Sequence, residues 1–315
     1  MKRTFKNCAV LLLALGLSWV LAPSNTAFGQ TEVKPITLKT MGSLFFGGTV
    51  TKKPDGDTFH GDHGYAQFYI PAQARDYPLI MWHGMGQSGR SWESTPDGRE
   101  GFQAILTRHD WAVYIIDQPR RGRAGYTQAR SDDPRAVPTT SRESSVWNAF
   151  RNGEWVPPNP PMAYPDVQFS LDAASIDQFF RQQTPNTGEE LMTNEYRAKL
   201  GRTMAALIEQ TGPAVLITHA NSGQYGWCTA MAAPDLVKAV VAYEPGAFVF
   251  PEGERPADIP AKAETVDFHM APRMVPLKEF QKPTKAPILF IDADNISPYP
   301  RDVLHVHFWR LATAP

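Results

Sequence analysis

The segment with the clearest chemical meaning is Ala214–Gly223, which reads as an apolar strand, a turn of small residues and the start of a helix. Such a turn strains the backbone and aims its central residue outward, so the residues two places before and after the centre must be small. Thr218 and Ser222 meet this requirement around Ala220. The position that would carry a nucleophile is therefore predicted to be Ala220, which has no oxygen to attack a carbonyl.

Ser222 is the alternative nucleophile in the same segment. Centring the turn on Ser222 would place Gln224 where a small residue is required, so the pattern favours Ala220 as the centre. A free Cys228 thiol is a third candidate by chemistry, and we interpret it as a small buried hydrophobic residue.

A second motif, His83-Gly84-Met85-Gly86, directly follows the apolar strand Leu79–Trp82. A glycine just past a strand lets the backbone turn sharply and expose N–H groups, which a site that stabilises a developing oxyanion requires. Alone, this motif also fits an ordinary turn between a strand and a loop.

The elements that position these motifs alternate along the chain between strand-like and helical patterns, which is typical of a mostly parallel sheet covered by helices. The predicted strands are Ser43–Val50, Tyr65–Ile70, Leu79–Trp82, Trp111–Ile116, Ala214–Thr218, Ala239–Tyr243 and Ile288–Ile291. Helices are expected at Gly101–His109, at Asn194–Gln210 and from about Ser222. Residues 126–193 and 247–287 lack steady periodicity, and we interpret both as cap insertions over the carboxyl edge of the sheet.

The first thirty residues resemble an export signal. Lys2, Arg3 and Lys6 precede an apolar run at Ala9–Leu21, and small residues near position 27 favour cleavage before Gln30. The run is shorter than the ~20 residues of a spanning helix, so we expect no stable membrane insertion. This predicts a signal peptide at 1–29, one α/β domain at 30–315, and a periplasmic or secreted product.

Composition excludes several classes of function. The formal charge of −1, from 31 basic and 32 acidic residues, argues against nucleic-acid binding. Of the two cysteines, Cys8 lies in the predicted leader, so no internal disulfide is expected. The cysteines and histidines show no zinc spacing, and no metal or organic cofactor is indicated.

Several separate segments together resemble the α/β-hydrolase superfamily, and most of all a branch of exported bacterial esterases. They are His83-Gly84, Trp92-Glu93-Ser94-Thr95-Pro96-Asp97-Gly98-Arg99, Ile116-Asp117-Gln118-Pro119-Arg120-Arg121-Gly122-Arg123 and Glu244-Pro245-Gly246, and the likeness runs from about residue 40 to 296.

The resemblance implies roles for individual residues. The backbone N–H groups of Met85 and Asn221 match the two oxyanion donors of the superfamily. Glu244 matches the acid of the esterase branch, while the more usual superfamily position makes Asp292 and Asp294 the alternative acids.

The catalytic histidine of the superfamily follows one further strand and precedes a final helix. The sequence ends at Pro315, soon after Ile288–Ile291, so we expect that strand, that helix and that histidine to be missing. His305 and His307 come late enough in the chain, but they fall where the preceding helix is expected.

The sequence therefore predicts an esterase-like hydrolase of carboxylic esters that is impaired or inactive, with a small ester or acyl compound as its ligand. A non-catalytic binding protein on the same scaffold, or an inactivated or truncated esterase fragment, is the alternative. The substrate and the oligomeric state stay open.

Overall fold

The computed structural model describes residues 34–125, 141–183, 187, 190, 191, 193–255 and 271–292. The predicted leader, the alternative acid Asp294, and His305 and His307 lie outside these ranges. Residues 293–315, on which the predicted absence of the last strand and helix depends, also lie outside these ranges.

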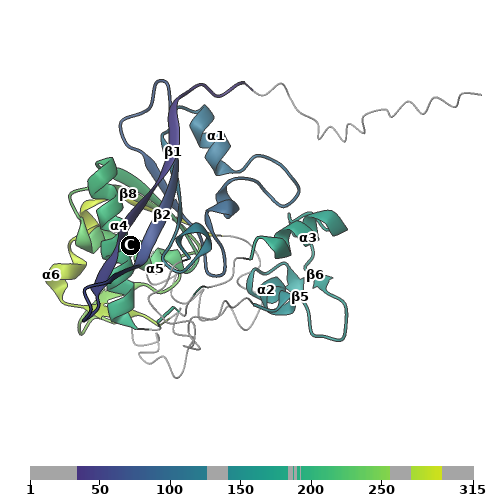
Figure 1. The fold of residues 1–315 in the computed structure, drawn as a ribbon. Helices are drawn as coiled ribbons and strands as arrows, with labels where there is room; N and C mark the ends of the chain where they lie inside the picture. The colour runs from purple at the N-terminus through teal and green to yellow at the C-terminus, as the bar shows by residue number, and fades with distance from the viewer. Residues whose placement is uncertain are drawn as a thin grey trace, which may run out of the picture. The chain divides into compact units, whose positions relative to one another are not determined.

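The central element is a sheet that, in the described residues, has seven strands in the order β1-β2-β4-β3-β7-β8-β11. Figure 1 labels three of them, β1, β2 and β8. These strands are β1 (Leu38–Lys52), β2 (Thr58–Pro71), β3 (Leu79–Trp82), β4 (Val113–Asp117), β7 (Ala214–His219), β8 (Val237–Tyr243) and β11 (Ile288–Ile291). β2 runs antiparallel to β1 and to β4, and the other neighbouring pairs are parallel. The predicted mostly parallel sheet is confirmed.

The helices of the described residues are α1 (Phe102–Arg108), α2 (Glu143–Ala149), α3 (Ala173–Arg181), α4 (Asn194–Thr211), α5 (Ser222–Ala232) and α6 (Leu277–Phe280). Short 3-10 turns lie at Gly89–Trp92, Gly122–Ala124 and Pro283–Lys285. α4 begins where the sequence predicts, because the Thr193 side chain accepts a hydrogen bond from the Tyr196 N–H and caps the helix.

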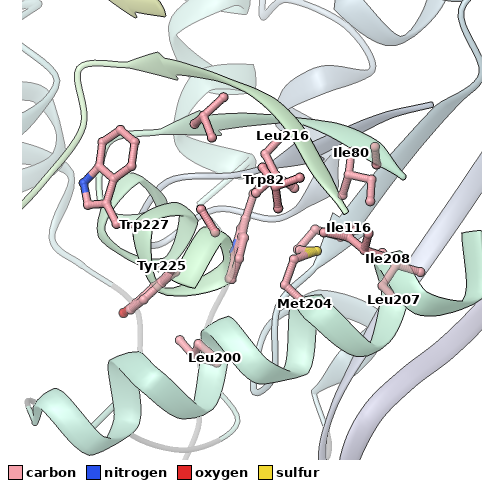
Figure 2. Packing of buried hydrophobic residues seen from close by; sticks show 14 of the residues in the cluster. Ile80, Trp82, Ile116, Leu200, Met204, Leu207, Ile208, Leu216, Tyr225 and Trp227 are labelled. Atoms are coloured by element: carbon pink, nitrogen blue, oxygen red, sulfur yellow. The ribbon is translucent and has the colours of Figure 1, made fainter. Parts of the chain in front are cut away.

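Side chains of the central strands alternate between two apolar clusters, one on each face of the sheet. Ile80 and Trp82 of β3 pack with α4 and α5, whereas Leu79 and Met81 of the same strand pack with Trp92 and α1. Figure 2 shows the first cluster, in which Leu200 and Met204 of α4 lie opposite Tyr225 of α5. Successive side chains of a strand point to opposite faces of the sheet. Because both faces are covered, nearly every position in these strands is apolar.

The first two strands extend well beyond the predicted Ser43–Val50 and Tyr65–Ile70, because they form one long hairpin paired from Leu38↔Pro71 to Lys52↔Thr58. Many of the side chains at the far end of this hairpin are exposed, including Val50 and Phe59. That end shows little of the burial pattern on which a sequence prediction depends.

The two stretches without periodicity contain short elements. β5 (Gly153–Glu154), β6 (Met162–Ala163), α2 and α3 come from residues 126–193 and lie together in Figure 1. β9 (Val249–Pro251) and β10 (Arg273–Val275) form a two-stranded parallel sheet within the second stretch.

Candidate active site

The turn between β7 and α5 holds Ala220 in a left-handed backbone conformation, with φ of 48°. Its N–H donates to the Tyr243 carbonyl at 2.9 Å, and its own carbonyl accepts from the N–H groups of Gly223 and Gly246 at 3.0 and 2.8 Å. A residue other than glycine adopts this conformation only under strain, which these hydrogen bonds maintain. The predicted strand, turn and helix are therefore present, with Ala220 at the centre.

Ser222, the alternative nucleophile, is completely buried at the start of α5. Its Oγ accepts from the His219 N–H at 2.9 Å and lies 3.0 Å from the Trp82 carbonyl, to which it can donate. The hydroxyl thus joins the ends of β3 and β7 by hydrogen bonds to the backbone. In this position the hydroxyl is shielded from solvent and bonded to the backbone.

The loop after β3 packs tightly against β7, the strand that leads into the turn at Ala220. We call this turn, from His219 to Ser222, the elbow. A Cβ atom on Gly84 would lie 2.8 Å from Nδ1 of His219, so the close approach requires glycine here. Met85 follows, and within the described residues its N–H donates to no backbone carbonyl. A donor without a partner suits the oxyanion role that the resemblance implies for Met85.

His83, the first residue of this loop, is fully buried and its side chain contacts the loop backbone. Its Nε2 accepts from the Gln118 N–H at 3.2 Å, so the ring proton is on Nδ1, which donates to the Gly84 carbonyl at 2.8 Å. Burial lowers the pKa of His83 to about 4, which keeps the imidazole neutral. His83 is therefore a hydrogen-bonding support for the loop and not a base.

Asn221 follows Ala220, and its side chain is buried in a polar cluster. Its Nδ2 donates to the Tyr225 hydroxyl at 3.1 Å and to Oε2 of Glu190 at 3.4 Å. Its Oδ1 accepts from Nε2 of Gln224. Sequence reasoning missed Glu190, which lies in a stretch without periodicity.

Glu244, the predicted acid, comes directly after β8 and also has a positive φ, of 43°. Its N–H donates to the Ile291 carbonyl at 2.8 Å, and its carboxylate forms an ion pair with the guanidinium of Arg151. The side chains of Arg151 and Glu244 are only 9% and 15% exposed, so this charge pair is largely removed from water. Arg151 was not predicted, because nothing in the local pattern marks it.

Asp292, an alternative acid, follows β11 and lies close enough to Glu244 to interact electrostatically. Partial burial raises the pKa of Asp292 to about 6, and the negative charge of Glu244 adds to the rise.

His219 is the described imidazole nearest to the elbow centre in sequence. Its ring lies near those of Trp92 and Phe150, with centroid distances of 6.5 and 6.3 Å. Burial lowers the pKa of His219, while the charge of Glu244 opposes the shift. Within the described ranges, His60 and His63 lie on β2 and His109 follows α1.

These contacts bring together three loops at the carboxyl edge of the parallel strands, namely those after β3, β7 and β8. The described residues contain no cluster of three or more histidine, cysteine, aspartate or glutamate side chains that could hold a metal ion. Within the same residues, no helix has the length and apolar character to cross a membrane. At the centre of the turn the structure places the methyl group of Ala220, which has no oxygen or sulfur atom that could act as a nucleophile.

Comparison with known proteins identifies two informative relatives. A solved structure described as that of a novel bacterial esterase superposes with a TM-score of 0.68 and 25% identity, covering 89% of this chain and 83% of that chain. A fungal protein named "Probable secreted lipase phiG", from Fungal sp. (strain ATCC 74256), is 31% identical over 192 residues. That match covers 58% of this chain and 48% of the relative, so it spans about half of the relative's length. No protein-family model matches the sequence.

Proposed function

We propose that this chain, which has the α/β-hydrolase fold and resembles bacterial esterases, binds small carboxylic esters or related acyl compounds at the elbow and is impaired in hydrolysing them. The observation that carries the proposal is Ala220, held at the strained centre of the turn where a nucleophile belongs. The proposed carbonyl donors are the N–H groups of Met85 and Asn221, and Glu244 is the proposed acid.

The size of the expected impairment follows from the chemistry of acyl transfer. Removing the serine of a comparable triad costs roughly 10⁶ in kcat, and oxyanion donors with binding leave about 10³ to 10⁴ over water. Ala220 can form no acyl intermediate, so only this residual contribution is expected.

The proposed acid, Glu244, has a charged partner close to the turn. In a Ser-His-acid triad the carboxylate orients an imidazole and stabilises its positive charge. Within the described residues, the guanidinium of Arg151 forms an ion pair with the Glu244 carboxylate. Ala220 also fits the second candidate, a non-catalytic binding protein that uses the same scaffold, because its methyl group cannot act as a nucleophile.

We also propose that residues 126–193 and 247–287 cap the elbow. Phe150, from the first stretch, contacts the His219 ring, and Gly246, just before the second, donates to the Ala220 carbonyl. Export to the periplasm or medium is proposed from the predicted leader, and the relative named a secreted lipase supports it.

The test uses the purified chain and p-nitrophenyl butyrate. We expect saturable binding, measured by saturation-transfer NMR, together with turnover far below that of an ordinary esterase. A fluorophosphonate probe followed by mass mapping should label no serine, Ser222 included.

Met85→Pro, which removes one proposed donor, should weaken binding, whereas Ser91→Ala, a change in the neighbouring 3-10 turn, should not.

Two outcomes would overturn the proposal. Brisk turnover or covalent labelling by the unmodified chain would show that an active nucleophile exists elsewhere. Absence of any saturable binding would remove the acyl-binding function itself.

A further inference from the structure

We propose that Glu190 is a positioning residue for this site, because its buried carboxylate holds the Asn221 side chain and thereby the backbone of the elbow. The inference rests on the proposed function in so far as it takes the Asn221 N–H as a carbonyl donor. It deepens that function by assigning the group that sets the donor in place.

The carboxylate of Glu190 accepts hydrogen bonds on both oxygens. Oε1 accepts from a terminal guanidinium nitrogen of Arg121 at 3.0 Å and from Nε2 of Gln118. Oε2 accepts from Nδ2 of Asn221 at 3.4 Å. The Glu190 and Arg121 side chains are 4% and 3% exposed, so the charges are paired away from solvent.

The same network extends to the second proposed donor. Gln118 accepts a hydrogen bond from Nε1 of Trp82 at 2.9 Å, and its N–H donates to Nε2 of His83 at 3.2 Å. His83 in turn donates to the Gly84 carbonyl, one residue before Met85. Glu190 is thus connected through side chains to the backbone beside both Met85 and Asn221.

A buried ion pair of this kind adds little net stability, because desolvation of the two charges offsets much of their attraction. It does impose geometry, since each partner left unpaired in a low dielectric is expensive. Nε of Arg121 already lacks a partner within the described residues, so loss of Glu190 would leave this guanidinium poorly satisfied. The Glu190 carboxylate therefore restrains the loop after β4 and the elbow together.

Glu190→Gln tests the contact with Asn221 specifically. A glutamine can keep an oxygen towards Arg121 and Gln118, but it then presents an NH₂ group to the Asn221 Nδ2, where two donors oppose each other. Asp62→Asn is the matched control, because Asp62 is a buried carboxylate, 7% exposed, that pairs with the cations Arg120 and Lys199.

Two readouts are measured on the full chain. The first is the amide resonance of Asn221 in the ligand-free protein, observed by selective ¹⁵N labelling of asparagine. The second is the affinity for p-nitrophenyl butyrate. We expect Glu190→Gln to shift or broaden the Asn221 amide and to weaken binding about tenfold. Asp62→Asn should lower the melting temperature without either change.

Asn221→Ala provides a second test in case Glu190→Gln does not fold. It leaves the backbone N–H and the ion pair between Glu190 and Arg121 intact, so a loss of affinity measures positioning alone. We expect a similar, about tenfold, weakening.

The inference is overturned if Glu190→Gln lowers only the melting temperature and leaves the Asn221 amide unchanged, or if folded Asn221→Ala binds the probe as well as the unmodified chain. Should the unmodified chain bind no probe, the acyl-binding function fails, while the amide comparison still decides the role of Glu190.

Discussion

At the scale of single residues, the site is defined by what stands at two strained positions. Ala220 and Glu244 both have positive φ, although neither is a glycine, and such conformations cost of order 1–3 kcal/mol each. Both lie where parallel strands end, at the edge of the sheet where α/β proteins bind ligands. Asp62, Asp110, Arg120 and Asp166 have positive φ elsewhere in the described residues, so strain alone does not mark the site; at Ala220 and Glu244 it coincides with this edge of the sheet.

His83 makes a prediction about pH at this scale. Its pKa is about 4 in the folded chain, below the ordinary value of 6.5, so the unfolded chain binds more protons between these values. Stability from the neutral ring is present above about pH 6.5 and is lost as the pH falls towards 4. The difference corresponds to roughly 3 kcal/mol.

Urea unfolding between pH 4.5 and 7 checks this expectation, with His83→Gln as the comparison. The glutamine variant should be less stable at neutral pH and should show a flatter pH dependence. An NMR titration that placed the His83 pKa near 6.5 would contradict the prediction.

At the scale of elements, the elbow depends on close packing between α5 and the loop after β8. A Cβ atom on Gly223 would lie 2.4 Å from Cβ of Pro245, closer than real atoms approach. The neighbouring Gly246 donates the hydrogen bond that holds the Ala220 carbonyl. The first turn of α5 therefore requires glycine so that the loop carrying Glu244 can reach the elbow.

Gly223→Ala should destabilise the protein by about 1–3 kcal/mol, because the added methyl group meets the backbone and ring of Pro245. Gly226→Ala, on the same helix, should have a smaller effect, since its Cβ would meet only a methyl group of Thr218 at 3.0 Å. Thermal unfolding of both variants measures the difference. Equal melting temperatures would show that the loop yields to the added methyl group.

At the scale of the whole molecule, the described residues place the site on a sheet covered on both faces, with the long β1–β2 hairpin at one edge. The parallel strands supply three neighbouring loops, and the aperiodic stretches supply Phe150 and Arg151 beside them. A rigid sheet with variable loops is how this class of fold changes its ligands while the scaffold is retained.

Export is the prediction that belongs to the whole chain. Expression in a Gram-negative bacterial host should give a periplasmic or secreted product whose intact mass corresponds to a chain beginning at Gln30. Leu13→Arg interrupts the apolar run and should leave the unprocessed chain in the cytoplasm. A product that keeps Met1 and reaches the periplasm would refute the proposed cleavage.

The sequence by itself determined the apolar parallel strands and the elbow. β3 and β11 have the predicted limits, and α4 begins at the predicted Asn194, because apolar runs and a capping residue are local signals. The turn at Ala220 could be predicted for the same reason, since the small residues that it requires, Thr218 and Ser222, lie only two positions away in the sequence.

Only the tertiary structure decided which charges surround the elbow. Glu190 and Arg151 lie far from Ala220 in sequence, in a stretch without periodicity, yet they contact Asn221 and Glu244. Hydrogen bonds and ion pairs between distant loops depend on the path of each loop over the sheet, which no repeating pattern encodes. The burial of Ser222 was equally hidden, because its hydroxyl bonds to the ends of two strands that only the sheet brings together.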